Sequence, residues 1–96
     1  MTVQDTIIQQ IGARNIMAIS GGRIKRSTDG LTIELPVAYG YSVTVTYDEG
    51  SDTYTVRRIF SRAGKQTIKH ERDYVYCDEV GETAYQASCY SNVPVF

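Results

Sequence analysis

Residues 41–60, YSVTVTYDEGSDTYTVRRIF, decide the fold of this chain. Apolar and polar side chains alternate in both arms of the stretch, which is the period of a strand with one buried and one exposed face. Residues 48–52, between the arms, supply the Gly and Asp residues that a hairpin loop needs. We therefore expect a β-hairpin, and its buried face should carry Tyr41, Val43, Val45, Tyr47, Tyr54 and Val56.

The composition is that of one small folded domain. A chain of 96 residues is too short to divide into two cores, and we assign residues 1–90 to a single domain and residues 91–96 to a C-terminal tail. Apolar residues make up 42% of the chain and charged residues 22%, which excludes a disordered polymer. Eight Tyr and no Trp suit the faces of a small sheet.

The residues before the hairpin predict a helix followed by strands. Thr2 and Asp5 have the spacing of a capping box, and apolar residues then recur at helical spacing until Gly12. The apolar run at residues 16–19 has the length of a short strand, and residues 31–35 alternate as a second strand that Pro36 ends.

The residues after the hairpin predict an edge strand and a second helix. Gly64 provides a turn, and the polar segment 66–72 reads as an edge strand. Acidic residues then precede a helical stripe formed by Val80, Ala84 and Ala87. The expected fold class is α+β: a helix, a four- to five-stranded mostly antiparallel sheet and a helix, with the helices packed on one face.

The sequence lacks the residue groupings that catalysis or metal binding requires. His70 is the only histidine and has no orienting partner in the pattern, and Cys77 and Cys89 read as two buried thiols. Gly21 and Gly22 do not complete a phosphate-binding fingerprint. We expect no enzyme activity, no catalytic or metal residues and no cofactor. The short apolar runs and the absence of a signal pattern predict a cytoplasmic protein without a membrane segment.

Basic residues cluster although the formal net charge is only −1. The main group lies within sixteen residues and consists of Arg57, Arg58, Arg62, Lys65, Lys69 and Arg72. A secondary patch consists of Arg23, Lys25 and Arg26. Beside Tyr54, Tyr74 and Tyr76, the main group could form a basic sheet face that follows phosphates, or its members could pair with acids on a mixed surface.

Several segments, in order, resemble a family of small proteins of unknown function found mainly in bacteriophages and prophage-like regions. The resemblance spans residues 7–90, and its segments are residues 10–12, Met17 with Gly21, residues 31–35, residues 52–56 and residues 74–79. The chain departs from the family pattern at Ala13, Ile16, Gly81 or Glu82, and residues 87–90. The resemblance implies a phage origin, expression in a bacterial host and an α+β fold, and it implies no active site.

These observations lead to two functional hypotheses. The first is a non-enzymatic binding module that engages a host or phage protein, for example as an inhibitor or modulator of a host process. The alternative is a nucleic-acid-binding protein that uses the basic sheet face. Because a sheet this small often buries an edge in a symmetric dimer, we also expect a homodimer, formed through the polar edge strand or through the face of the sheet that carries the tyrosines.

Overall fold

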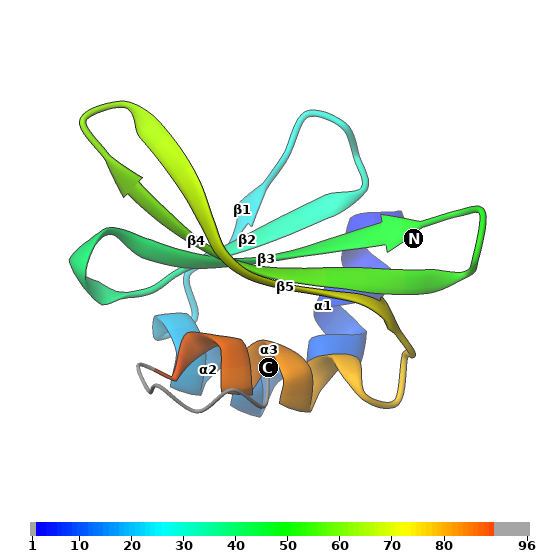
Figure 1. Cartoon of the computed structure of the whole chain (residues 1–96). Helices are drawn as coiled ribbons and strands as arrows, with labels where there is room; N and C mark the ends of the chain where they lie inside the picture. The colour runs from blue at the N-terminus through cyan, green and yellow to red at the C-terminus, as the bar shows by residue number, and fades with distance from the viewer. Residues whose placement is uncertain (1, 90–96) are drawn as a thin grey trace.

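The computed structural model describes residues 2–89, which form two layers, a sheet and the helices that cover one of its faces (Figure 1). The predicted α+β class, with the helices on one face, is confirmed. The predicted tail, residues 91–96, lies outside the described residues. The elements in chain order are α1 (Val3–Ile11), α2 (Ala13–Ser20), β1 (Lys25–Arg26), β2 (Thr32–Pro36), a 3-10 turn (Ala38–Gly40), β3 (Tyr41–Asp48), β4 (Thr53–Arg62), β5 (Lys65–Val75) and α3 (Val80–Ser88).

The sheet is an antiparallel meander in which every strand pairs with its neighbour in sequence, in the order β1-β2-β3-β4-β5. The predicted hairpin is its centre, since β3 and β4 pair from Tyr41 opposite Phe60 to Asp48 opposite Thr53. The segment predicted as an edge strand is β5, the last strand of the sheet. Gly64 has φ 79° in the β4–β5 turn, as its position in the sequence predicted.

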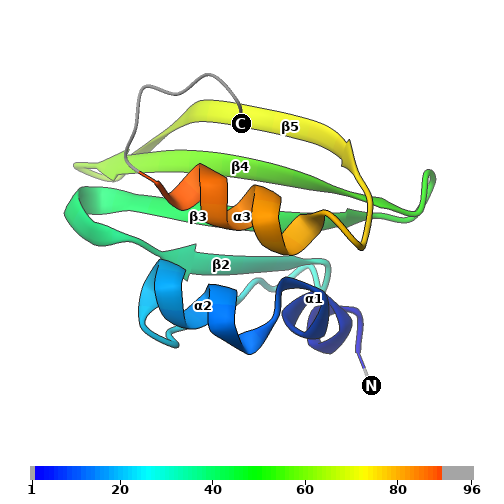
Figure 2. The same ribbon diagram turned by 90° about the horizontal axis from the view of Figure 1, so that it is seen from below.

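The core lies between the sheet and the helices (Figure 2). Val43, Val45 and Val56 are fully buried, which confirms that the central hairpin forms the floor on which the helices pack. Burying each such side chain stabilises the fold by roughly 1.5–3 kcal/mol. The helices contribute Ile7, Ile11, Ile16, Ile19, Val80, Ala84 and Ala87 to this core.

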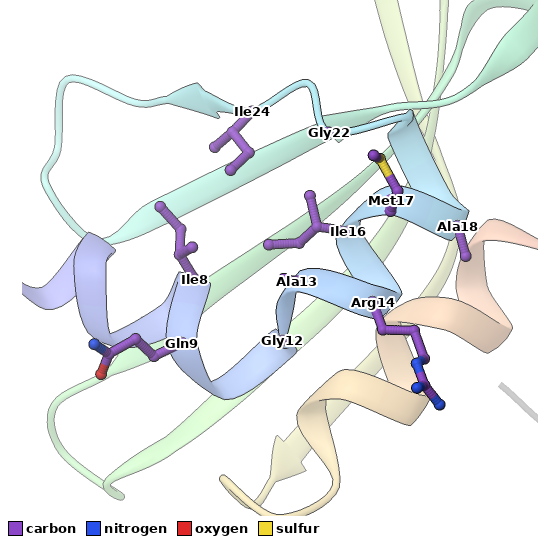
Figure 3. Close-up of a pocket in the computed structure, with 10 residues that line it drawn as sticks. All are labelled: Ile8, Gln9, Gly12, Ala13, Arg14, Ile16, Met17, Ala18, Gly22 and Ile24. Atoms are coloured by element: carbon purple, nitrogen blue, oxygen red, sulfur yellow. The ribbon is translucent and has the colours of Figure 1, made fainter.

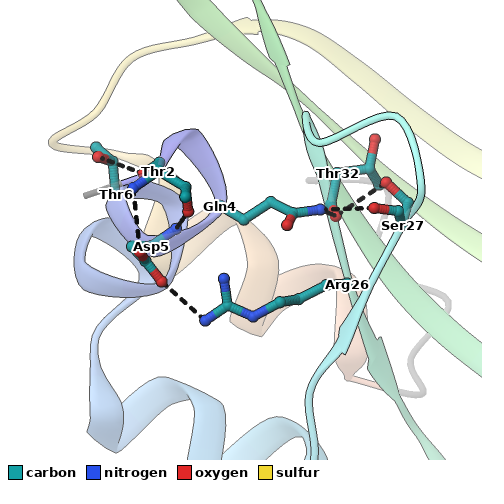
Figure 4. Close-up of polar contacts among 7 residues, drawn as sticks. All are labelled: Thr2, Gln4, Asp5, Thr6, Arg26, Ser27 and Thr32. Atoms are coloured by element: carbon teal, nitrogen blue, oxygen red, sulfur yellow. Dashed lines mark hydrogen bonds and ion pairs between the residues drawn. The ribbon is translucent and has the colours of Figure 1, made fainter.

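Helix α1 begins with the predicted capping box and is tied to the β1–β2 turn (Figure 4). The hydroxyl of Thr2 accepts from the Asp5 backbone N–H at 3.1 Å, and the Asp5 carboxylate accepts from the Thr2 N–H at 3.0 Å. Gln4 is buried, and its Nε2 donates to the carbonyl oxygens of Ser27 and Thr32. These bonds hold the helix N-terminus against the turn between the first two strands.

The strand predicted at residues 16–19 is wrong, because these residues belong to helix α2. Ile16 and Ile19 are both buried, at 4% and 6% exposure, while Met17 is 64% exposed. A strand would place Ile16 and Ile19 on opposite faces, whereas a helix places residues three apart on the same face. Four consecutive apolar residues carry no period, so the run alone could not distinguish a strand from a buried helical turn.

Helix α3 follows the predicted stripe and packs closely on the junction of α1 and α2. A Cβ at Gly81 would lie 2.7 Å from the Ile11 carbonyl oxygen and 2.8 Å from Asn15 Nδ2, so only glycine fits this approach. The expectation of two buried thiols is wrong, since Cys77 and Cys89 are both exposed. Cys77 lies in the turn before α3 and Cys89 follows the last residue of this helix, so neither belongs to its buried stripe.

Candidate functional site

The register of β4 and β5 separates the predicted basic residues between the two faces of the sheet. Side chains alternate along β4, so Arg58 and Arg62 share the helix-side face with buried Val56, and Arg57 points to the opposite face. Lys65 pairs with Arg62 across the two strands and therefore lies on the helix side as well. The predicted basic sheet face is thus a helix-side group, without Arg57.

Arg58 is buried, and its guanidinium holds the C-terminal end of α3. Its Nη1 donates to the carbonyl oxygen of Ala87 at 2.6 Å and to that of Cys89 at 3.1 Å, and its Cζ lies 4.3 Å from the Tyr41 ring centroid. A cation is favourable here because the last carbonyls of a helix carry partial negative charge. The prediction that Arg58 binds a partner is therefore corrected: the side chain is buried, and its guanidinium stabilises the C-terminal end of α3.

One exposed cation, Lys69, lies over an aromatic pair formed by β3 and β4 near the β4–β5 turn. The rings of Tyr41 and Phe60 have centroids 4.9 Å apart and are tilted by 48°. Lys69 Nζ lies 5.7 Å from the Phe60 centroid, within the range of a cation–π contact. We call the exposed group Arg62, Lys65 and Lys69, together with Phe60 beneath it, the cationic surface.

The outer edge of β5 borders the cationic surface and is irregular. Residues 65–74 are all exposed, and within residues 2–89 no other strand pairs with this edge. Register shifts occur between Arg58 and Ile59 and between Tyr54 and Val56, and Tyr74 has φ 57°. Bulges and charges of this kind discourage the addition of another strand. The cationic surface is therefore better suited to contacts through side chains than to extension of the sheet.

The other predicted basic residues have contacts within the fold. Arg57 forms an ion pair with Glu71 on the face opposite the helices, and Arg72 Nη2 lies 3.9 Å from Glu79 Oε2. The secondary patch lies at the far edge of the sheet, on and beside β1. There Lys25 Nζ is 3.9 Å from Glu34 Oε2, Arg26 Nη2 is 2.8 Å from Asp5 Oδ1, and Arg23 Nε donates to the Ser20 carbonyl oxygen.

Acidic residues gather at the opposite end of the strands. Asp48, Glu49 and Asp52 lie in or beside the β3–β4 turn, whereas Arg62 and Lys65 form the last pair at the other end of β4. The hydroxyl of Tyr47 donates to Asp52 Oδ1 at 2.5 Å, and this bond raises the pKa of Tyr47 to about 12. Charge is therefore separated along the strand direction, a feature that the net charge of the sequence conceals.

The sequence did not predict an apolar groove of about 1050 Å³ that lies between α1, α2 and the segment before β1 (Figure 3). Its walls include Ile8, Ile16, Met17 and Ile24, and Arg14 lies at its rim. The assignment of residues 16–19 to a strand concealed this groove. A helical reading would have found an exposed Met17 beside two buried isoleucines.

The part of the chain that the structure describes contains no cluster of three or more His, Cys, Asp or Glu side chains placed to hold a metal ion. None of its helices is long and apolar enough to cross a membrane. Comparison with family models, with curated proteins and with solved structures gave no match.

Proposed function

We propose that this protein is a non-enzymatic binding module whose cationic surface engages an acidic segment of a partner protein. One observation carries the proposal. Arg62 and Lys65 are directly opposite each other at the end of a hairpin, and within residues 2–89 neither forms an ion pair. Like charges on a cross-strand pair repel, so an acidic partner would remove an unfavourable interaction while it forms favourable ones.

The position of the hairpin supports the same proposal. The β4–β5 turn rises away from the helices at one corner of the sheet (Figure 1), so Arg62 and Lys65 lie where a large partner can reach them. Lys69 on β5 and the half-buried Phe60 on β4 continue the surface away from the turn. Arginine and aromatic side chains are frequent anchors of protein interfaces, and charges around them increase the rate of association.

A protein partner fits this surface better than a nucleic acid does. Within this surface the Arg58 guanidinium packs on the Tyr41 ring and Lys69 lies over Phe60, whereas single-strand binders present ring faces on which bases stack. The exposed rings of Tyr74 and Tyr76 lie at and beyond the other end of β5, away from the cationic surface. Three exposed cations also offer few phosphate contacts. The acids at residues 48–52 would repel a polyanion that followed the strands.

The resemblance to phage and prophage proteins supports the rest of the proposal. It favours a phage origin and a partner that is a host or phage protein, with inhibition or modulation of a host process in the bacterial cytoplasm as the outcome. The absence of a metal-binding cluster among residues 2–89 neither supports nor opposes a host or phage protein as the partner. The hypothesis depends on the surface and on the resemblance, and each can be tested separately.

Fluorescence anisotropy with two labelled probes tests the surface. One probe is a peptide of alternating Glu and Ser, and the other is a single-stranded oligonucleotide of equal charge. We expect the peptide to bind with the higher affinity and the R62E/K65E variant to lose this binding. The R14E/R23E variant, which changes the net charge equally at another place, should keep it. Equal peptide binding by both variants contradicts the proposal, and preferential binding of the oligonucleotide supports the nucleic-acid alternative.

A further inference from the structure

The face of the sheet without helices carries one row of side chains that crosses all five strands. Register pairs Lys25 with Glu34, Glu34 with Thr44, Thr44 with Arg57, and Arg57 with Glu71. These five residues, the central row, point away from the helices, since their strand neighbours Ile33, Val45 and Val56 are in the core. From β1 to β5 the charges of the row are positive, negative, neutral, positive and negative.

We propose that this face binds a second copy of the chain, with a twofold axis that runs along β3 midway between the two sheets. Rotation about this axis reverses the order of the row in the second copy. Glu34 then faces Arg57 of the partner, and Lys25 faces Glu71 of the partner, while Thr44 lies at the axis. Because the contact is isologous, each opposite-charge pair occurs twice.

The charge pattern selects this axis over the other twofold axis that lies between the sheets. An axis across the strands would keep the order of the row, so that Lys25 would face Lys25 and Glu34 would face Glu34 of the partner. Like charges across an interface are unfavourable, and opposite charges determine the orientation in which two copies associate. The central row is therefore complementary to itself in one orientation only.

The neighbouring rows also match in the proposed orientation. Thr32, Thr46 and Thr55 form a row of small polar side chains, in which Thr32 would face Thr55 of the partner. On the other side of the central row, Pro36, Ser42 and Ile59 form a further row. In this row Pro36 would face Ile59 of the partner, so an apolar side chain meets another apolar one. Ile68 pairs with Ile59 and is 54% exposed, which extends the apolar part of this face.

The twist of the sheet permits two such faces to approach closely. In Figure 1 the β4–β5 turn and the tip of the β1–β2 turn both bend away from α2 and α3, and Figure 2 places them at opposite ends and opposite sides of the sheet. The base of the β1–β2 turn stays in contact with α1 through Gln4. A twisted sheet has two raised corners and two lowered ones. Rotation about the twofold axis places each raised corner of one sheet over a lowered corner of the other, so the distance between the two sheets stays nearly constant. Face-to-face sheets in proteins pack in this way, with their strands nearly aligned.

Sedimentation velocity with charge-reversal variants tests the proposal. Wild type should form a dimer that dissociates as salt increases. E34R alone and R57E alone should be at least about tenfold weaker dimers, since each places like charges opposite each other twice. An equimolar mixture of E34R and R57E should form a heterodimer with wild-type affinity, because every pair of facing charges is then opposite. The R62E/K65E variant, altered on another surface, should dimerise like wild type.

A variant that fails to dimerise only because it is unfolded is recognised separately, so the test remains decisive. Circular dichroism identifies an unfolded variant, and the pair K25E and E71K then repeats the test at the outer positions of the row. A wild-type chain that stays monomeric at high micromolar concentration overturns the proposal. Single variants that dimerise like wild type, or folded variants whose mixture forms no heterodimer, overturn it as well.

Discussion

Arg58 Nη1 donates a hydrogen bond of 2.6 Å to the carbonyl oxygen of Ala87, which joins the middle of β4 to the last turn of α3. A second bond, to Cys89, completes the contact. We expect R58M to lower the free energy of unfolding by about 2–4 kcal/mol, because it leaves the buried carbonyl oxygen of Ala87 without this donor and removes the bond to Cys89. R57M, one residue away on the other face, should cost less than about 1 kcal/mol when urea denaturation is measured on the monomer, at low protein concentration. Equal losses would contradict the assigned role of Arg58.

Gly81 tests the close contact between α3 and the junction of α1 and α2. An alanine at this position would gain about 1 kcal/mol of helix propensity, yet its Cβ would lie 2.7 Å from the Ile11 carbonyl oxygen. We expect G81A to be destabilised by about 1–3 kcal/mol because α3 must move away. The matched control is G50A, where the added Cβ meets the Asp48 side chain at 3.4 Å. If thermal denaturation shows G81A to be more stable than wild type, the close approach is wrong.

The helical conformation of residues 13–20 determines which apolar residues of α2 are buried, and therefore which ones should stabilise the fold. I16A and I19A should each lower the free energy of unfolding by about 2–4 kcal/mol, since both side chains are buried. M17A should change it by less than about 1 kcal/mol, because Met17 is exposed. Urea denaturation of the three variants distinguishes a helix from a strand. In a strand, Ile16 and Ile19 would lie on opposite faces, and only one of these two substitutions would be costly.

The lowered pKa of Asp5 leads us to expect that the stability of the fold depends on pH in the acid range. Its pKa is lowered from 3.8 to about 2, first by the hydrogen bond from the Thr2 backbone and then by Arg26. Because the folded state holds the pKa below its unfolded value, the contribution of Asp5 to stability is present above pH 3.8 and is lost as pH falls toward 2. The Tm difference between wild type and D5N should therefore shrink over this range. A difference that is constant with pH would show that ionised Asp5 contributes nothing.

The central hairpin and the class of the fold were predictable because their information is local. Alternation in residues 41–60 has a period of two over both arms, and only a strand with one buried face has this period. The capping box of α1 and the position of Gly64 in a turn are likewise set by a few neighbouring residues. Prediction failed at residues 16–19, where consecutive apolar residues carry no period.

The candidate site was predictable only in part. Clustering of basic residues identified Arg62, Lys65 and Lys69, but the separation of Arg57 from Arg58 depends on which face of β4 is buried. The alternation of Tyr54 and Val56 already contained that signal, since Arg58 continues their face. The carbonyl groups of α3 that Arg58 binds, and the row that joins Lys25 to Glu71, come from tertiary pairing. No local pattern in the sequence reveals them.

Affinity capture from a bacterial host lysate, with and without nuclease, tests the central claim most directly. The wild-type chain and the R62E/K65E and R14E/R23E variants serve as bait at low and at moderate salt. We predict that wild type and R14E/R23E retain an acidic protein, that nuclease does not release it, and that R62E/K65E does not retain it. Retention of the same protein by R62E/K65E, or its loss after nuclease treatment, would contradict a protein-binding role for the cationic surface.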